Sequence, residues 1–326
     1  MSLRPTTDGV VEIRPPASGD AATLIAGRDA EFHRFLGPGA DEPQPVGCIV
    51  VVGDVVGWVD YDVTRDWLVP GEVNVGYYLF ASARGRGYAT RAVHLLLHHL
   101  AVSTDQRIAT LLIARDNHRS LALADRAEFV PAGDVDGSRF FKRAVPPLAY
   151  TDGVVKIRRL EAEDLDRDLE AKDDVQIRWL WLPGQREQWA AMAPSEQRAH
   201  ALAGLCSRRD AFGAGPKWEF AADGPGERYV AYVDCDLAND LVPHGEANIA
   251  YSCHPAYRGR GYVSRAVRLI LDFLRDHTAA PCAHIIVDAE NIPSLRVARV
   301  VGAVETERWV NDAGRTMLRH LLELDR

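Results

Sequence analysis

The sequence has little of what secreted, metal-bound or membrane proteins require. Five cysteines are scattered over 326 residues without a C-x-x-C pair, namely Cys48, Cys206, Cys235, Cys253 and Cys282. Their odd number and their spacing argue against a disulfide framework and a zinc site, and favour a reducing compartment. No apolar run approaches the roughly 18 residues of a membrane-spanning helix, and residues 1–9 contain no apolar signal region. We therefore expect a cytoplasmic protein with no bound metal and no membrane contact.

Positive charge is also scarce. The formal net charge is −8 at pH 7, and only four of the 38 basic residues are lysines. Because a nucleic-acid-binding protein usually presents an excess of positive charge, we expect no nucleic-acid partner. A chain of 326 residues is long enough for two domains of about 150 residues, each with its own core.

One segment of the sequence occurs twice. Residues 71–100 and 245–274 align without a gap, whereas the two openings at 8–14 and 152–158 are separated by a shorter offset. Self-similarity over this length predicts two successive domains, which we place at residues 1–148 and 149–326. The second copy therefore carries an insertion, at residues 185–214. With its apolar face and Ser195 as an N-cap, this insertion predicts an extra helix that the first domain lacks.

Each copy of the repeated segment predicts a strand, a glycine loop and a helix. In the first copy, alternation over residues 72–79 is typical of a strand. The loop at residues 84–87 follows, and apolar residues at 93, 96, 97 and 100 then mark one face of a helix. A helix start carries unpaired N–H groups and partial positive charge, and glycines allow a ligand to approach the backbone closely. The segment therefore predicts a site for phosphate or another anion.

The loop resembles a known motif. Arg84-x-x-Gly87-x-Ala89 is similar to the pyrophosphate-binding motif Q/R-x-x-G-x-G/A of the GNAT superfamily of acyl-CoA-dependent N-acyltransferases. The second copy repeats the motif from residue 258 but ends it in Val263, which departs from the Gly/Ala pattern. In that family, the motif holds the pyrophosphate of acetyl-CoA.

A second motif supports the resemblance. Asn117-x-x-Ser120 and Asn291-x-x-Ser294 are similar to the RimJ/RimL-type branch, which acetylates ribosomal proteins and small amines. The resemblance implies an α/β (mixed, α+β) fold with two GNAT-like domains, each a mostly antiparallel mixed sheet flanked by helices, and acetyl-CoA as cofactor. The cofactor-binding residues that it implies are Leu79, Arg84, Gly85, Arg86, Gly87, Tyr88, Ala89, Thr90 and Asn117 in the first copy, and Cys253, Arg258, Gly259, Arg260, Gly261, Tyr262, Val263, Ser264 and Asn291 in the second.

Two glutamates are candidates for the catalytic base. Acylation of an amine requires a group that takes the amine's proton. Glu72 and Glu246 begin the strand before the glycine loop and could act through a bridging water; the alternative is a solvated carboxylate at a strand start. The RimJ/RimL-type branch often carries a glutamate two residues later, where this chain has Asn74 and Asn248.

The remaining candidates also have structural alternatives. The resemblance implies that Ser120 and Ser294 protonate the CoA thiolate, whereas a serine at a helix start is also a common N-cap. Aspartates at positions 60, 62, 234 and 236 could receive the acceptor's ammonium group or lie on a solvated sheet face. We interpret Cys253 as a small buried hydrophobe and not as a nucleophile. The histidines at positions 94, 98 and 99 are interpreted as surface or packing residues.

These features together predict an N-acetyltransferase that moves an acetyl group from acetyl-CoA directly to a primary amine on a small molecule or a peptide. We expect the second domain to turn over, because its insertion supplies a wall for the acceptor. The alternatives are catalysis by the first domain, whose Ala89 keeps the stricter motif, a non-catalytic acyl-CoA sensor or scaffold, and a mycothiol-synthase-like tandem enzyme. We expect either a monomer whose copies pack as a pseudo-dimer or a homodimer.

Overall fold

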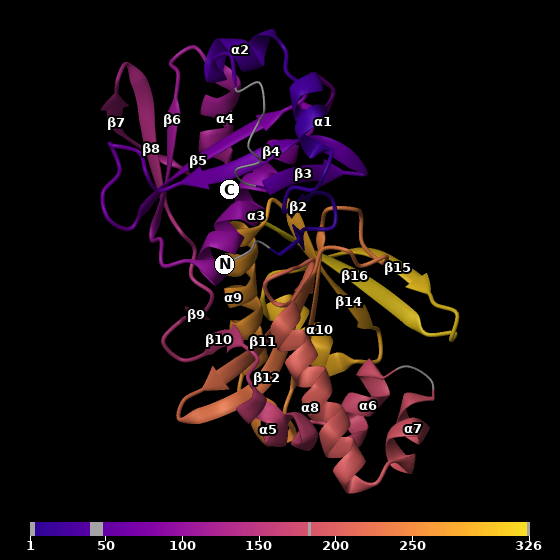
Figure 1. The fold of residues 1–326 in the computed structure, drawn as a ribbon. Helices are drawn as coiled ribbons and strands as arrows, with labels where there is room; N and C mark the ends of the chain where they lie inside the picture. The colour runs from indigo at the N-terminus through magenta and orange to yellow at the C-terminus, as the bar shows by residue number, and fades with distance from the viewer. Residues whose placement is uncertain (1–3, 40–47, 182–183, 325–326) are drawn as a thin grey trace.

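The computed structural model describes residues 4–39, 48–181 and 184–324. Two domains follow one another along the chain and lie one above the other, in indigo to magenta and in magenta to yellow (Figure 1). Each contains one eight-stranded sheet with helices on both faces. In both sheets one neighbouring pair of strands is parallel and the others are antiparallel. The predicted fold class is therefore confirmed.

The first domain has the strand order β1-β2-β3-β4-β5-β6-β8-β7. Helices α3 and α4 cover one face of this sheet, and α1 packs on β4. Its elements are β1 Thr6–Thr7, β2 Glu12–Arg14, α1 Asp20–Ala26, α2 Ala30–Leu36, β3 Cys48–Val52, β4 Asp54–Asp62, β5 Glu72–Leu79, the 3-10 turn η1 Ala81–Ala83, α3 Tyr88–Ser103, β6 Ile108–Ile113, α4 His118–Arg126, β7 Val130–Val135 and β8 Ser138–Ala144.

The second domain has the matching order β9-β10-β11-β12-β13-β14-β16-β15, with α9 and α10 packed together and α8 on β11. Its elements are β9 Tyr150–Thr151, β10 Lys156–Arg159, η2 Ala162–Asp164, α5 Leu165–Glu170, α6 Asp174–Leu180, α7 Gln185–Ala191, α8 Pro194–Ala211, β11 Lys217–Gly224, β12 Glu227–Asp236, β13 Ala247–Cys253, η3 Pro255–Tyr257, α9 Tyr262–His277, β14 Cys282–Asp288, α10 Ile292–Val300, β15 Val304–Val310 and β16 Thr316–Glu323.

In the middle of each sheet, the two parallel strands are hydrogen-bonded over only a short part of their length and then separate. Strands β5 and β6 pair only from Glu72 opposite Ile108 to Asn74 opposite Thr110. Strands β13 and β14 pair only at Ala247 and Asn248. Beyond these residues the two strands of each pair lose their mutual hydrogen bonds. The backbone therefore leaves an opening at the end of β5 and of β13, where the glycine loops follow.

The helices before each sheet differ from the sequence-based expectation. We predicted one helix over residues 17–36 and one over 161–182, but each is divided into shorter pieces. The break occurs where Asp29 and Asp173 accept hydrogen bonds from N–H groups of the next turn and start α2 and α6. The first domain therefore does have a second helix, α2, in the place of α6. Residue 182 lies outside the described residues.

The insertion at 185–214 forms two helices, α7 and α8, where we had expected one. Pro194 occupies the first turn of α8, where a proline loses no helical hydrogen bond. Ser195 is therefore inside the helix and is not its N-cap. The Glu196 carboxylate instead accepts a hydrogen bond from the Ala193 N–H at 2.8 Å.

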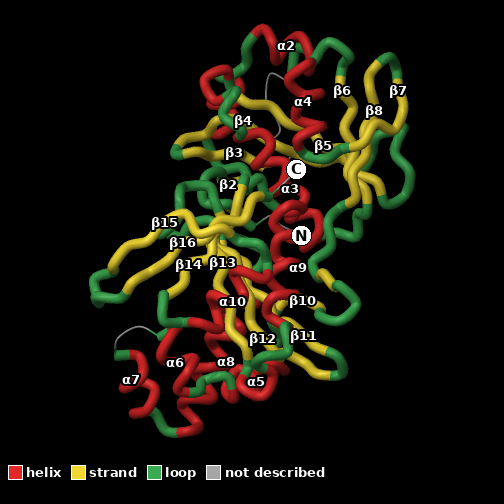
Figure 2. Tube along the Cα trace, turned by 180° about the vertical axis from the view of Figure 1, so that it is seen from behind, coloured by secondary structure: helices red, strands yellow, loops and turns green. Residues whose placement is uncertain are grey.

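The two domains pack through α3 and α9, which lie side by side at the centre of the molecule (Figures 1 and 2). The histidines of α3 are buried there, so they are packing residues and not surface residues. The Trp218 indole N–H donates to His98 Nε2 at 3.2 Å, and His98 Nδ1 lies 3.0 Å from His277 Nδ1. His277 Nε2 in turn donates to the carbonyl oxygen of Pro147 at 2.9 Å. This chain of bonds joins both domains and the linker.

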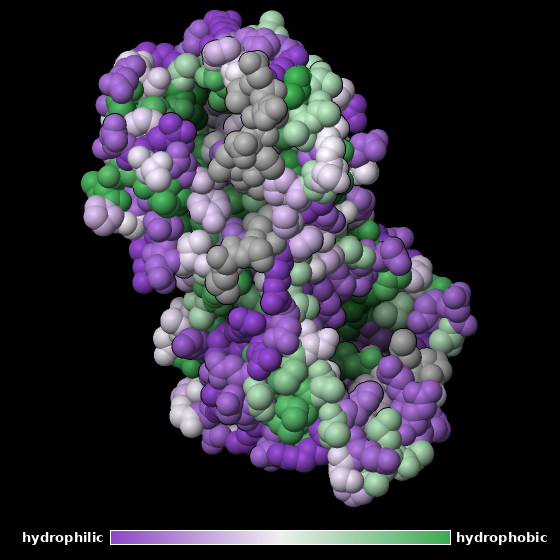
Figure 3. Space-filling model, viewed as in Figure 1, coloured by the Kyte–Doolittle hydropathy of each residue, from purple (hydrophilic) through white to green (hydrophobic). Residues whose placement is uncertain are grey.

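The surface is mixed in polarity. Figure 3 shows polar side chains over most of the visible face, with hydrophobic side chains gathered in hollows of both halves. No helix within the described ranges is long and apolar enough to cross a membrane.

Candidate functional site

The loop–helix junctions of the two domains have the same backbone geometry. Gly85 and Gly87 have φ angles of 76° and 78°, and Gly259 and Gly261 have 76° and 77°. These left-handed conformations suit glycine and turn the chain into α3 and α9. Neither N-cap glycine provides a side chain that bonds the first turn. The first backbone N–H groups of both helices are therefore available to an anion.

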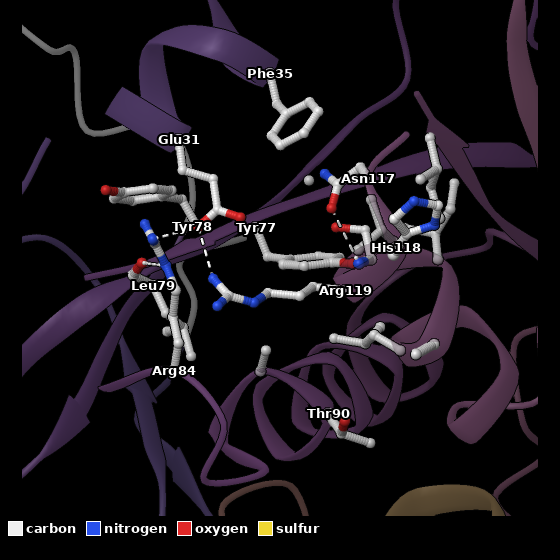
Figure 4. Close-up of a pocket in the computed structure, with 18 of the residues that line it drawn as sticks. Glu31, Phe35, Tyr77, Tyr78, Leu79, Arg84, Thr90, Asn117, His118 and Arg119 are labelled. Carbon is white, nitrogen blue, oxygen red and sulfur yellow. Dashed lines mark hydrogen bonds and ion pairs between the residues drawn. The ribbon is translucent and has the colours of Figure 1, made fainter. Parts of the chain in front are cut away.

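In the first domain this junction faces a cavity of about 670 Å³ (Figure 4). The cavity runs from α2 and the glycine loop past β5 to the ends of β6 and the start of α4. A cavity of this size falls in the range of small-molecule and cofactor sites. Among its lining residues are nearly all of the first-copy residues singled out from the sequence, namely Leu79, Arg84, Gly85, Gly87, Tyr88, Ala89, Thr90, Asn117 and Ser120. Arg86 is not part of the lining.

Arg84 is held by carboxylates of this chain. Its guanidinium donates to the Leu79 carbonyl oxygen at 2.8 Å and to Asp29 at 2.8 and 3.1 Å. The hydrogen bond from Arg84 keeps the pKa of Asp29 well below its usual range. Arg258 donates to Asp173 in the same way, at 2.6 and 2.8 Å. The motif arginines thus fasten the loop to the helix before the sheet, and the backbone N–H groups remain the main anion donors.

Ion pairs connect α2 with α4 across the cavity. Glu31 accepts hydrogen bonds from Arg84 at 2.5 Å and from Arg119 at 2.8 Å (Figure 4). Arg34 bonds Asp116 at 2.5 Å, just before α4. The cavity is therefore spanned by charged side chains that could rearrange when a ligand enters.

Asn117 is the N-cap of α4 and Asn291 is the N-cap of α10. Each side-chain oxygen accepts from the N–H of the serine three residues later, at 3.1 Å in α4 and 3.3 Å in α10. Ser120 lines the first-domain cavity. The Ser294 hydroxyl is 2.8 Å from the Tyr251 hydroxyl.

Sequence reasoning missed a tyrosine in each copy. Tyr77 lines the cavity, and burial raises the pKa of its hydroxyl to about 12, although the Ser120 hydroxyl acts against this rise. Burial likewise raises the pKa of Tyr251 to about 12, with Ser294 opposing. The two tyrosines are separated by the same number of residues as the two serines, and this repeat could have identified them from the sequence. Each domain therefore has a tyrosine and a serine beside the opened strands. The two hydroxyls are within hydrogen-bond distance in the second domain, whereas the Tyr77 hydroxyl is buried without a hydrogen-bond partner among the described residues.

The two candidate glutamates are engaged elsewhere. Glu72 is only 4% exposed, forms an ion pair with Lys142, and does not line the cavity. Glu246 accepts a hydrogen bond from His284 Nε2 at 2.5 Å. Partial burial acts to raise the pKa of Glu246, but the hydrogen bonds from His284 and Cys282 outweigh it and the pKa is lowered. A lowered pKa makes Glu246 a weaker base.

Asp60 is a partly buried carboxylate next to the cavity. It faces Gly76 across β4 and β5, and Gly76 lines the cavity; a Cβ at Gly76 would lie only 2.4 Å from an Asp60 oxygen. Burial raises the pKa of Asp60 to about 6. Burial also raises the pKa of Asp234 to about 6, but that carboxylate is paired with Lys217 at 3.2 Å and accepts from Tyr232 at 2.6 Å. Of the two alternatives for these aspartates, a solvated sheet face does not fit Asp234, which is only 3% exposed.

The second domain has a smaller cleft of about 290 Å³ between α5, α6, α8 and strands β12 and β13. The inserted helix α8 contributes His200 and Arg208 to its wall. None of the second-copy residues predicted as site residues lines this cleft, although Ser252 and His254 on either side of Cys253 do. Cys253 is partly buried, and this burial raises the pKa of its thiol to about 11.

One group of side chains within the described residues could hold a metal ion. Glu246, Cys282 and His284 each offer one ligand atom, and these atoms lie within 4.8 Å of one another. Sequence analysis did not reveal this group, because its members come from two separate segments.

Comparison with family models identifies one family. A family model described as an acetyltransferase (GNAT) domain matches residues 11–130 and again residues 155–304. No curated protein sequence matches the chain significantly.

Solved structures match about half of this chain at low identity. They include RimJ of Mycobacterium smegmatis in complex with CoA-disulfide (19% identity, 52% of this chain and 82% of that one, TM-score 0.43). A ribosomal-protein-S5-alanine acetyltransferase from Vibrio fischeri is 13% identical over 54% of this chain and 97% of its own, with a TM-score of 0.42. A GNAT-family acetyltransferase from Bacillus anthracis is 13% identical over 55% and 99%, with a TM-score of 0.41.

Proposed function

Because the chain belongs to the GNAT acetyltransferase family, whose members use acetyl-CoA, we propose that it transfers an acetyl group to a primary amine and that the first domain seats the acyl-CoA. The observation that carries this proposal is the 670 Å³ cavity, which unites the glycine loop, the opened strands and the start of α4. The motif Asn117-x-x-Ser120 supports a place in the RimJ/RimL-type branch.

The residues of the cavity suit the parts of acetyl-CoA. The unpaired N–H groups at the start of α3 meet the negative charge of a pyrophosphate. The ladder between β5 and β6 ends at Asn74 opposite Thr110, and the gap beyond it faces the cavity and can receive the amide-bearing arm of the cofactor. When bound, acetyl-CoA supplies an activated thioester carbonyl.

The chemistry needs one base and one acid. The amine nitrogen forms the new C–N bond with its lone pair while the C–S bond breaks. Because a protonated amine has no free lone pair, it must first lose a proton to a base. We assign that proton to Asp60, because a carboxyl with a pKa of about 6 is ionised at neutral pH and still basic. Glu72 is occupied by Lys142 and is a weaker choice. The hydroxyl of Ser120 or Tyr77 returns a proton to the leaving thiolate.

A second candidate places catalysis in the second domain, as the sequence favoured. The observation behind it is the cleft walled by α8, since an acceptor bound there would lie beside Ser252 on β13. In that case Ser294 and Tyr251 take the role of the acid, and Glu246 acts as the base through a water. Each domain could then bind acetyl-CoA, with the acceptor walls deciding which one turns over.

Calorimetric titration of acetyl-CoA separates the two candidates. Gly87→Asp places a carboxylate at the anion site. Gly87→Asn puts a side chain of similar size in the same left-handed backbone conformation but adds no charge. A Cβ at Gly87 or at Gly261 would have nothing within 4 Å apart from the adjacent residues of the chain, so the first atom of either side chain has room. We expect Gly87→Asp to weaken binding at least about 100-fold, or about 2.7 kcal/mol, and Gly87→Asn to keep most of it.

Gly261→Asp and Gly261→Asn form the matched pair in the second domain. Loss of binding in Gly261→Asp with retention in Gly87→Asp would move the productive site to the second domain. Binding in the parent without release of CoA thiol for any of a panel of amines would favour the sensor. A folded parent that binds no acetyl-CoA would overturn the acetyltransferase proposal.

A further inference from the structure

The first and third residues of β14 converge with the residue that precedes β13. Cys282 and His284 point to the same face because alternate residues of a strand share a side, and Glu246 reaches them from the neighbouring strand. His284 Nε2 is 2.5 Å from a Glu246 oxygen and 3.7 Å from the Cys282 sulfur. Cys282 and His284 are buried, and Glu246 is partly exposed. Nitrogen, sulfur and oxygen thus meet at one partly accessible point.

The first domain shows what balances a glutamate at this position. There Glu72, Ile108 and Thr110 occupy the matching places, and Lys142 faces Thr110 across β6 and β8. The ammonium of Lys142 pairs with the Glu72 carboxylate.

In the second domain the residue opposite His284 is the apolar Leu321. The second domain therefore has Leu321 where the first has Lys142. It has Cys282 and His284, which are of types that can bind metals, where the first has Ile108 and Thr110. Arg319 also acts on Glu246, but its guanidinium bonds Glu307 at 2.5 Å and the carbonyl oxygen of Leu241 at 2.7 Å.

We propose that Glu246, Cys282 and His284 form a site for a transition-metal ion, with zinc as the best match. Thiolate, imidazole and carboxylate together are zinc ligands, whereas magnesium and calcium prefer oxygen alone. Zinc–ligand bonds of about 2.0–2.3 Å put the ligand atoms of one tetrahedral ion roughly 3.3–3.6 Å apart. The sulfur–nitrogen distance already fits, and the nitrogen–oxygen distance has to open by about 1 Å.

Binding requires that two protons move. Zinc displaces the thiol proton of Cys282 to solvent, and His284 shifts its N–H proton from Nε2 to Nδ1. Among the described residues His284 Nδ1 is buried without a hydrogen-bond partner, so no existing hydrogen bond at Nδ1 has to be broken when the proton moves there. Three protein ligands leave one position for water. The ion would tie the start of β13 to β14 next to Gly245, whose carbonyl oxygen accepts from Arg91 of the first domain at 3.2 Å.

The test uses the full chain and cobalt(II) or zinc alone. Cobalt(II) added to the parent should give a thiolate-to-cobalt charge-transfer band and tetrahedral d–d bands, and dialysed protein should retain about one zinc per chain. Cys282→Ser should abolish the charge-transfer band, and His284→Gln should weaken binding at least about tenfold. Cys253→Ser, which removes a thiol outside the group, should leave both signals intact.

Leu321→Lys gives a test that leaves every ligand in place. The new ammonium should occupy the position that Lys142 has in the first domain, so cobalt affinity should fall at least about tenfold while Cys282 stays present. A parent without cobalt bands or retained zinc would overturn the proposal, as would bands that persist in Cys282→Ser. These signals do not depend on acetyl-CoA, so the site can fail while the acetyltransferase proposal stands, and the reverse.

Discussion

The two domains keep the same loop but differ in what surrounds it. In the first domain, the glycine loop opens onto a cavity of about 670 Å³, and Asp60 lies behind its wall. The cleft of about 290 Å³ in the second domain lies instead against the inserted helix α8. The φ angles of Gly87 and Gly261 nevertheless differ by only one degree, 78° against 77°.

This difference separates what a duplicated scaffold must keep from what it can change. The turn into α3 and α9 depends on backbone conformation, which only glycine adopts easily, so both copies retain it. Charge balance at the foot of the parallel strands depends on side chains alone. Glu72 is balanced by Lys142, whereas Glu246 faces His284 and Cys282. Divergence is therefore found where a side chain can be exchanged without moving the backbone.

The largest effect that we predict compares buried arginines at the start of the two sheets. Arg158 bonds Asp164 at 2.8 and 2.9 Å, and Asp164 is fully buried. Arg158→Ala removes two of the hydrogen bonds of the Asp164 carboxylate and leaves Arg228, at 2.6 Å, as its ion-pair partner. It should therefore lower the free energy of unfolding of the second domain by about 3 kcal/mol, the low end for breaking a buried ion pair. The matching pair, Arg14 with Asp20, is more exposed, so Arg14→Ala should cost about half as much in the first domain.

Urea unfolding followed by the fluorescence of Trp218, which is buried in the second domain, measures this difference. Equal losses in both variants would show that burial does not separate the two ion pairs.

The interface between the domains should be sensitive to acid. Burial lowers the pKa of His98 to about 4 and also lowers that of His277. The pKa of an unfolded histidine is about 6.5, so on acidification the unfolded state binds a proton before the folded state does. The free energy of unfolding is therefore unaffected above pH 6.5 and decreases as the pH falls toward 4. For His98 this loss reaches about 3 kcal/mol, because one pKa unit corresponds to about 1.36 kcal/mol.

Unfolding curves at pH 7, 5.5 and 4.5 measure this loss. His98→Gln, which cannot be protonated, is the control, and its curve should flatten by the amount that His98 contributes. An unchanged slope in His98→Gln would contradict the assignment.

The sequence predicted the local features of both domains and missed those that depend on distant partners. The strand, glycine loop and helix follow from residues that are neighbours in the chain. The break before α2 depends on Asp29, which is also held by Arg84 from 55 residues further along. The meeting of Glu246 with Cys282 and His284 requires that β13 and β14 pair in parallel. Spacing in the sequence could not reveal such a group, so the expectation of no metal site rested on local motifs only.

The roles of Asp60 and Asp234 form the next comparison. If the first domain turns over, activity should rise with pH through about 6, because Asp60 must be ionised to take a proton. Asp60→Asn should lower kcat about 100-fold and remove this rise. Asp234→Asn should change kcat less than about threefold, since that carboxylate is held by Lys217 and Tyr232. A larger loss in Asp234→Asn than in Asp60→Asn would assign turnover to the second domain.

The smallest predicted effect concerns two exposed ion pairs. One joins α2 to the residue two positions before α4, and the other joins α6 to the residue two positions before α10. Arg34 with Asp116 and Arg178 with Glu290 occupy matching places and are exposed, so Arg34→Ala and Arg178→Ala should each change the free energy of unfolding by less than about 1 kcal/mol. Arg34 does not line the larger cavity itself, but its guanidinium lies over the ring of Phe35, which does. Its loss should therefore raise the dissociation rate of acetyl-CoA by about two- to threefold, and Arg178→Ala should not. Because exposed ion pairs are screened by salt, stopped-flow measurements at high ionic strength should bring the parent and Arg34→Ala together. A difference that survives high salt would mean that Arg34 acts through packing and not through its charge.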